Sequence, residues 1–181
     1  MSKRRDAAAA ASEAILYVER RASSVPGVVG TVGMLDVPNG SINVVPGRCE
    51  FSLDIRAPDD TARDACANDV MEELRQIALR RGVEITLDLS MRASAAPCDP
   101  AWRARWEGAV DALGVPIHRL PSGAGHDAMK LAEVMPQAML FVRGQNGGIS
   151  HNPLESITND DADLAARAFA RLLDDVAAER G

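Results

Sequence analysis

The sequence has 181 residues, of which 46% are hydrophobic and 3% aromatic, and its net charge is −6. This length allows one large or two small domains, and the apolar content is sufficient for a core of mainly aliphatic side chains. The acidic balance argues against nucleic-acid binding, because nothing here could neutralise a row of phosphates. The sequence contains no apolar run near the roughly 20 residues that span a bilayer.

The N-terminal charges are not followed by the apolar stretch of a secretory signal. The three cysteines (Cys49, Cys66 and Cys98) are widely spaced and odd in number, which fits a reduced cytoplasmic protein better than a disulfide framework. We therefore expect a cytoplasmic protein with no membrane or nucleic-acid partner.

The first half of the chain alternates helical and strand patterns. Residues 4–21 have apolar positions at helical spacing. Two strands are predicted next: one over residues 28–37, and one that begins over 42–45, is interrupted by Pro46-Gly47 and continues over 50–56. In the last of these, Phe51, Leu53 and Ile55 share one face, which leaves Arg56 on the face away from the core. A helix is predicted from residue 58 to Gly82 and a strand over 83–89. The order α-β-β-α-β predicts a two-layer, ferredoxin-like sandwich that lacks one strand of a β-α-β-β-α-β unit.

A small-residue and proline stretch at residues 93–97 is the best candidate for a linker, so we expect domains at 1–94 and 95–181. Beyond it, helices are predicted over 99–113, 126–134 and 160–178, with strands over 116–120 and 138–142. These are β-α units typical of a parallel sheet, and the fold class expected for the whole chain is α/β (α+β).

Three segments are candidates for function. His151 lies in the glycine-rich loop of residues 144–155, after a predicted strand, where it could be a metal ligand, an acid/base or only a surface residue. The turn of residues 122–128, with Gly125 and His126, could bind an anion or could be a tight β-α turn. Asn43 and Arg56 could together hold a carboxylate, or could be a turn residue and a surface arginine.

Five motifs, in this order, resemble the dinuclear-metal amidohydrolases that include allantoate amidohydrolase, N-carbamoyl-L-amino-acid hydrolase and β-alanine synthase, relatives of the aminoacylase and carboxypeptidase-type zinc peptidases. The motifs are Val29-Gly-Thr-Val-Gly33, Ser41-Ile-Asn-Val-Val-Pro-Gly47, Phe51-Ser-Leu-Asp-Ile-Arg56, Pro121-Ser-Gly-Ala-Gly-His-Asp-Ala128, and Gly148-Ile-Ser-His-Asn-Pro153 with Glu155. They span nearly the whole chain.

The resemblance implies that His151 is the last metal ligand of a site for zinc, manganese or cobalt. It also implies that Asn43 and Arg56 grip the substrate carboxylate and reach into the partner subunit of a homodimer, while Gly125 and His126 line the substrate pocket. Residues 1–94 would be a lid and dimerisation domain, and residues 95–181 the C-terminal part of a zinc-peptidase-like catalytic domain.

In the family, a His-Ala-Gly-Thr-Thr-Pro-Met segment precedes an Arg-Arg-Asp-Ala helix, and this sequence begins at that methionine. The first lid strand, the other metal ligands and the general-base glutamate are therefore expected to lie outside it. We expect a fragment of a hydrolase that acts on N-carbamoyl amino acids or allantoate and is inactive alone. The alternatives are one subunit of a split enzyme with a separate N-terminal catalytic chain, a stand-alone dimerisation or carboxylate-binding module, or a truncated reading frame.

Overall fold

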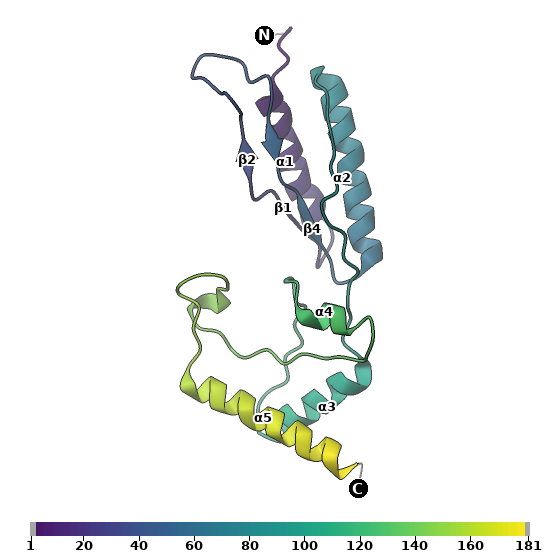
Figure 1. Cartoon of the computed structure of the whole chain (residues 1–181), viewed down its shortest axis with the longest axis vertical. Helices are drawn as coiled ribbons and strands as arrows, with labels where there is room; N and C mark the ends of the chain where they lie inside the picture. Colours follow the sequence, from purple (N-terminus) through teal and green to yellow (C-terminus); the bar gives the residue numbers. More distant parts are fainter. Residues whose placement is uncertain (1–2, 180–181) are drawn as a thin grey trace. The chain divides into compact units, whose positions relative to one another are not determined.

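The computed structural model describes residues 3–179, which divide into two compact units. The first unit contains residues up to 95 together with 121–125, and the second contains residues 96–120 and those from 126 onward. Both units mix helices with irregular backbone, and the first unit also holds a small sheet (Figure 1). Among the described residues, no helix is both long enough and apolar enough to cross a membrane.

Two capped helices form one layer of the first unit. The carboxylate of Asp6 accepts the Ala9 N–H at 3.1 Å at the start of α1 (Ala7–Ser23). Asp59 caps α2 (Asp60–Arg81), which ends at Gly82 in the left-handed conformation with φ 64°. An acidic cap satisfies free N–H groups at a helix start, and glycine adopts positive φ without a Cβ clash. The predicted helices at 4–21 and 58–82 are therefore confirmed, with slightly shifted ends.

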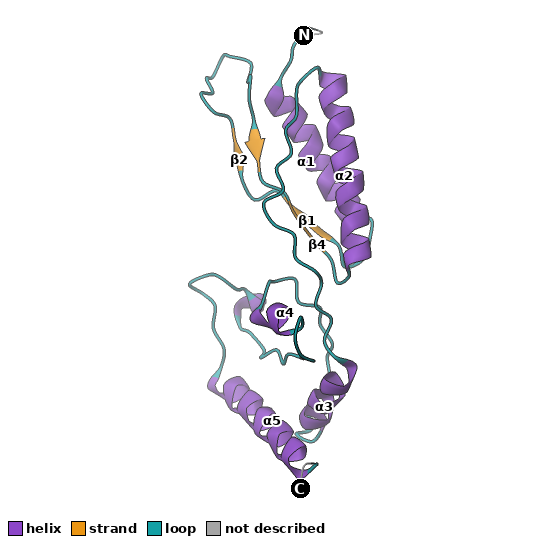
Figure 2. Ribbon diagram, turned by 45° about the vertical axis from the view of Figure 1, so that its right-hand side comes forward, coloured by secondary structure: helices purple, strands orange, loops and turns teal. Residues whose placement is uncertain are grey.

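The strands lie against these two helices (Figure 2). β1 (Val29–Thr31) pairs antiparallel with β4 (Asp54–Arg56), and β2 (Leu35–Asp36) pairs antiparallel with β3 (Glu50–Phe51). Between the two ladders, residues 32–34 of one strand face residues 52–53 of the other, so the register shifts by one residue. An extra residue of this kind bends a strand pair locally, as a β-bulge does.

The core of the first unit lies between the helices and the inner face of the strands. Its buried members come from α1, α2 and the residue just before β1: Ala10, Ala14, Val18, Ala22, Val28, Cys66, Val70, Leu74 and Ile77. Phe51, Leu53 and Ile55 pack against this cluster, while Arg56 is exposed on the opposite face. The alternation predicted for residues 50–56 is therefore confirmed. It fixes which side chains of this strand are free to form a site.

The second unit is held together mainly by two helices. α3 (Pro100–Asp111) packs against α5 (Asn159–Ala178), and the rings of Trp106 and Phe169 stack with centroids 5.8 Å apart. The short helix α4 (Asp127–Leu131) and the 3-10 turn η1 (Asn146–Gly148) lie between them in the chain. The three helices predicted for this part are confirmed, although α4 is shorter than expected.

One segment of a predicted strand and three whole predicted strands do not form. Residues 42–45 include a turn in which the Val44 N–H bonds to the Ser41 carbonyl at 3.3 Å. Residues 83–89, 116–120 and 138–142 have no strand partner among the residues 3–179 that the structure describes. A strand needs the N–H and C=O groups of a neighbour, so apolar alternation by itself does not create one. The observed order in the first unit is thus α1-β1-β2-β3-β4-α2, without the strand predicted after the second helix.

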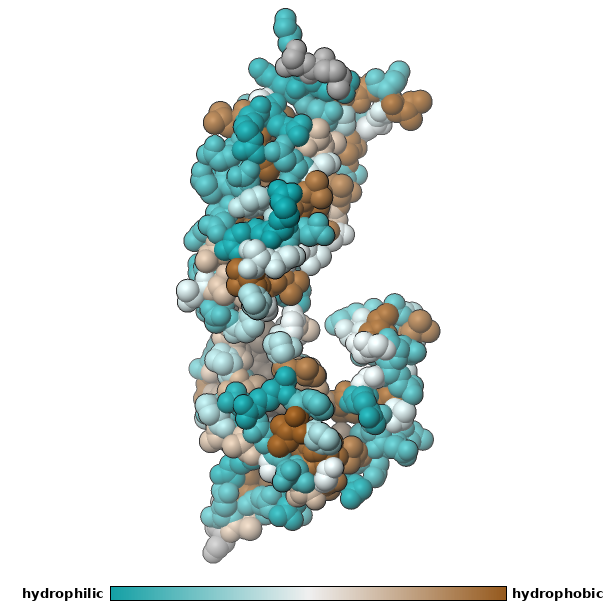
Figure 3. All heavy atoms as spheres, turned by 180° about the vertical axis from the view of Figure 1, so that it is seen from behind, coloured by the Kyte–Doolittle hydropathy of each residue, from teal (hydrophilic) through white to brown (hydrophobic). Residues whose placement is uncertain are grey.

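The unpaired segments leave hydrophobic side chains exposed. Leu89 in the first unit is 82% exposed, and Leu120 and Phe141 in the second unit are 66% and 51% exposed. Hydrophobic residues are accordingly visible on the surfaces of both units (Figure 3).

Candidate functional site

A shallow pocket of about 390 Å³ opens on the outer face of the strands in the first unit. It is lined by Val29, Thr31, Gly33, Ser52, Asp54, Arg56 and Gly123. Side chains two residues apart on a strand point to the same face. Because Phe51, Leu53 and Ile55 turn toward the core, Asp54 and Arg56 are both presented to this pocket.

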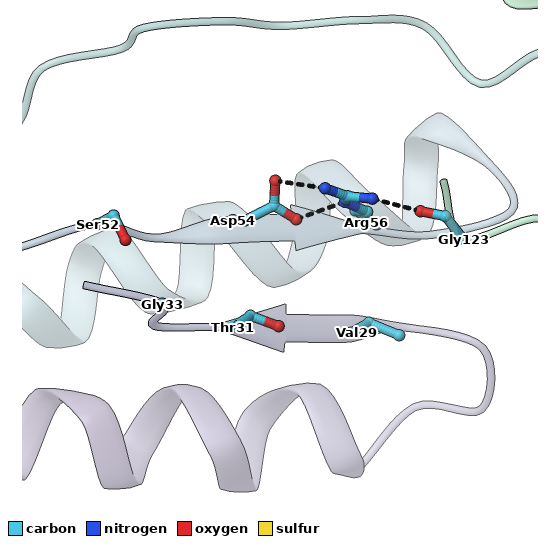
Figure 4. A pocket seen from close by; sticks show the side chains of 7 residues that line it. All are labelled: Val29, Thr31, Gly33, Ser52, Asp54, Arg56 and Gly123. Atoms are coloured by element: carbon cyan, nitrogen blue, oxygen red, sulfur yellow. Dashed lines mark hydrogen bonds and ion pairs between the residues drawn. The ribbon is translucent and has the colours of Figure 1, made fainter. Parts of the chain in front are cut away.

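Arg56 is held by two neighbours on the pocket wall (Figure 4). Its Nε and Nη2 atoms donate to the two carboxylate oxygens of Asp54 at 2.6 and 3.3 Å, and its Nη1 donates to the carbonyl of Gly123 at 2.7 Å. The hydrogen bond to Asp54 raises the pKa of the Arg56 guanidinium, so the group stays charged. A fixed guanidinium is a better anion receptor than a mobile one, because less side-chain entropy is lost on binding.

The guanidinium still has donors to offer. An arginine side chain carries five N–H groups, and the two terminal nitrogens of Arg56 each use one of theirs on Asp54 or Gly123. Within residues 3–179, one N–H therefore remains without a partner on each terminal nitrogen. A carboxylate can accept two such N–H groups together, so the pocket retains the chemistry of a carboxylate receptor.

Asn43 does not line this pocket. It lies in the turn that follows β2, where its amide oxygen accepts the Ser41 hydroxyl at 3.2 Å. The structure thus places Arg56, but not Asn43, in the pocket of the first unit.

The glycine-rich segment from Ser122 to Gly125 belongs to the first unit, and Gly123 is the part of it that contacts Arg56. His126 begins the next element: it caps α4, and its Nδ1 accepts the Ala128 N–H at 3.1 Å. The cap role of this histidine was not anticipated from the sequence.

The His151 loop is closed at its base by one backbone hydrogen bond and one side-chain hydrogen bond. The Gln145 N–H donates to the Ser156 carbonyl at 2.9 Å, and Asn146 Nδ2 donates to the Leu154 carbonyl at 2.7 Å. Gln145 and Asn146 are therefore the residues that close the loop. The sequence signal was available, since asparagine tolerates left-handed backbone and bonds to nearby peptide groups.

The backbone of this loop turns sharply at several positions. Asn146, Gly147 and Gly148 have φ values of 51°, 74° and 73°, and His151 itself has φ 55°. A positive φ is uncommon for a residue with a side chain, although histidine is among the residues enriched there. The His151 N–H donates to a carboxylate oxygen of Glu155 at 2.8 Å, which helps to hold this conformation. The loop therefore holds His151 in an exposed and conformationally defined position.

The exit of the loop is anchored to α5. Arg143 donates from Nε and Nη2 to one oxygen of Asp161 at 2.9 and 2.6 Å, and the Thr158 hydroxyl donates to the other at 2.6 Å. These hydrogen bonds, from Thr158 first and Arg143 second, lower the pKa of the Asp161 carboxyl. Asp161 is only 6% exposed, so this ionised group joins the strand-like segment before the loop to the helix after it.

The described residues do not complete a metal site around His151. Within residues 3–179, no group of three or more His, Cys, Asp or Glu side chains is placed to hold a metal ion. A zinc site needs about three or four protein ligands. His151 is therefore an isolated candidate ligand, and no chemical step can be assigned to a metal from these residues.

Comparison with known proteins identifies the chain. A family model described as peptidase family M20/M25/M40 matches residues 6–175. The chain is 39% identical over 169 residues to the N-carbamoyl-L-amino acid amidohydrolase of Geobacillus stearothermophilus, covering 93% of this chain and 41% of that protein. It is 33% identical over 203 residues to a probable allantoate deiminase of Oryza sativa subsp. japonica, covering 96% and 41%.

A solved structure agrees with these relatives. An amidase of the hydantoinase/carbamoylase family from Burkholderia multivorans matches with a TM-score of 0.90 and 35% identity, over 95% of this chain and 42% of that one. The chain thus spans about two fifths of the length of the curated relatives it matches. The resemblance based on the five motifs is confirmed: this chain belongs to peptidase family M20/M25/M40.

Proposed function

We propose that this chain is the carboxylate-binding part of a hydrolase that acts on linear C–N bonds of N-carbamoyl amino acids or of allantoate. The observation that carries the proposal is the Arg56 pocket, where a fixed guanidinium keeps one free N–H on each terminal nitrogen. The printed names of the relatives support the substrate class, since N-carbamoyl amino acids and allantoate all bear a carboxylate beside a ureido group.

In this proposal the first unit is a lid and dimerisation domain, and the second is the C-terminal part of the catalytic domain. Asn43 lies outside the Arg56 pocket of its own chain, and in this proposal Asn43 and Arg56 would together grip the substrate carboxylate at the site of a second copy. Gly125 and His126 would line the substrate site, and His151 would be one ligand of a zinc, manganese or cobalt ion in the complete enzyme.

The chain by itself is proposed to bind but not to hydrolyse such substrates. His151 is one candidate ligand, and the described residues place no further two ligands around it. After zinc is added to the purified chain and the excess is removed by dialysis, the chain should retain well under one zinc ion per molecule. It should also show no turnover of N-carbamoyl-L-alanine. A stoichiometric metal content with measurable turnover would contradict this part of the proposal.

The carboxylate site can be tested directly. We expect the purified chain to bind N-carbamoyl-L-alanine in an NMR titration, and Arg56→Ala to weaken binding roughly tenfold or more, because charge-assisted hydrogen bonds are lost. Arg56→Lys should recover only part of the affinity, since an ammonium cannot offer two parallel N–H groups. Arg75→Ala is the matched control, because Arg75 is a similarly exposed arginine that pairs with Glu72 on α2 and lies outside the pocket.

Equal binding by the wild type and Arg56→Ala would show that Arg56 is not the carboxylate receptor.

Two further measurements separate the proposals about assembly. Sedimentation equilibrium should show a homodimer if the first unit is a dimerisation domain. Co-expression with a separate N-terminal catalytic chain should restore turnover if the chain is one subunit of a split enzyme.

A further inference from the structure

The Arg56 pocket contains two opposite charges. Among its seven lining residues, Asp54 and Arg56 are the only ionisable ones, so the net formal charge of the lining is zero. Their side chains are 48% and 51% exposed, which leaves both groups within reach of a ligand in solvent. A negatively charged ligand that binds in this pocket is therefore repelled by the carboxylate of Asp54.

Asp54 also decides which edge of the guanidinium is free. Its two oxygens occupy Nε and Nη2 of Arg56, while the Gly123 carbonyl takes one N–H of Nη1. A ligand carboxylate can then approach the remaining N–H groups of the terminal nitrogens without displacing Asp54. It will then lie at the edge of the guanidinium group next to the edge that Asp54 occupies.

We propose that Asp54 determines the specificity of this pocket: it positions Arg56 for one ligand carboxylate and discriminates against ligands that carry a second acidic group. The proposal rests on the proposed function, since it assumes that Arg56 receives the carboxylate. It extends that function by defining the substrate class as monoanionic ureido acids with neutral side chains.

The physical reason is that the repulsion from Asp54 grows with the charge of the ligand. Coulomb energy is proportional to the product of the charges, so a dianion near Asp54 is repelled up to twice as strongly as a monoanion. For charges about 6 Å apart in a water-like dielectric, the repulsion from Asp54 by itself weakens the binding of a monoanion roughly threefold, whatever the loss of positioning in Asp54→Asn does to both probes alike. For a dianion, whose Coulomb repulsion is up to twice as large, the same repulsion weakens binding up to roughly tenfold.

The test compares two probes and two asparagine variants. The dissociation constants of N-carbamoyl-L-alanine and N-carbamoyl-L-aspartate are measured at neutral pH and low salt by NMR titration. The wild type should prefer the alanine derivative, and Asp54→Asn should reduce this preference roughly threefold. Asp69→Asn is the matched control: Asp69 is 54% exposed, pairs with Arg21 at 2.8 Å and lies outside the pocket, so its loss should leave the preference unchanged.

The salt dependence of the preference distinguishes an electrostatic role of Asp54 from a purely structural one. Raising the ionic strength shortens the range of the charge on Asp54, so the difference between the wild type and Asp54→Asn should shrink. Thermal unfolding checks that the variant remains folded, which we expect because the Asp54 side chain is half exposed and asparagine has nearly the same shape.

The outcomes distinguish the two proposals. An unchanged preference in Asp54→Asn, or an equal loss of affinity for both probes, would overturn the assignment of Asp54 while leaving Arg56 as the receptor. Binding that survives Arg56→Ala, or no binding of either probe to the wild type, would instead overturn the proposed function and the assignment of Asp54 with it.

Discussion

The contact between β1 and α1 gives the sharpest test of how the packing supports the site. Gly30 lies in the middle of β1, and a Cβ built on it would be 3.0 Å from Cγ1 of Val18 and 3.1 Å from Cβ of Ala22. Both neighbours are buried, with exposed fractions of 2% and 4%. Substitution of Gly30 by alanine should therefore push the strand away from the helix.

The expected magnitude follows from two opposing terms. Adding a methyl group to a closely packed core costs about 1–3 kcal/mol. Replacing glycine by alanine also raises the free energy of unfolding by about 0.4–1 kcal/mol, because the unfolded chain has less backbone freedom. We expect Gly30→Ala to lower the free energy of unfolding by about 1 kcal/mol and Gly30→Val to lower it by more. Because Gly30 pairs with Ile55, next to Arg56, both variants should also weaken carboxylate binding.

The assay is urea unfolding followed by far-UV circular dichroism. Tryptophan fluorescence would not serve, since Trp102 and Trp106 both belong to the second unit. Gly33→Ala is the matched control, because the nearest atom to a Cβ at Gly33 is the Ser52 hydroxyl oxygen, at 3.9 Å. If Gly30→Ala were as stable as Gly33→Ala, or more stable than the wild type, the proposed close packing of β1 on α1 would be refuted.

Two further predictions concern the second unit. Hydrogen bonds lower the pKa of Asp161 in the folded chain. The stabilisation by Asp161 should therefore be fully present above about pH 4, the usual unfolded pKa, and be lost as the pH falls through the folded pKa. In a plot of the free energy of unfolding against pH, followed by tryptophan fluorescence, Asp161→Asn should flatten this acid limb. Asn146→Ala should speed amide hydrogen exchange at Gln145, since it removes the bond to Leu154 and disfavours φ 51°.

Each of these predictions has a control. Asp163→Asn removes a carboxylate that is 70% exposed and only 3.9 Å from Arg167, so it should leave the acid limb unchanged. An identical pH profile for the wild type and Asp161→Asn would contradict the role of Asp161. For the loop, Asn146→Gly keeps the left-handed backbone but not the side-chain bond, and its exchange rate should be intermediate. Exchange at the wild-type rate in Asn146→Ala would show that another contact closes the loop.

The helices were predictable because their signals are local. Asp6, Asp59 and Thr158 each precede a run of apolar residues at helical spacing, and in the structure each accepts an N–H from the first turn of its helix. These patterns act within a few residues and do not depend on the rest of the chain. The strands behaved differently, since their pairing requires a second segment at a suitable distance.

The site was predictable only in part, for a similar reason. The alternation of residues 50–56 placed Arg56 on the outer face, and the structure confirms this placement. The contact with Gly123 joins residues 67 positions apart in the chain, so no local pattern could reveal it.

The sequence alone determined the helix positions, the inner and outer faces of residues 50–56, and the family, because caps, periodicity and ordered motifs are properties of neighbouring residues. The tertiary structure alone decided which strand segments pair, and that Asp54 and Gly123 hold Arg56 while leaving it two free donors. Backbone ladders and fixed ion pairs form only where folding brings separate groups to hydrogen-bonding distance and compensates the entropy of ordering them.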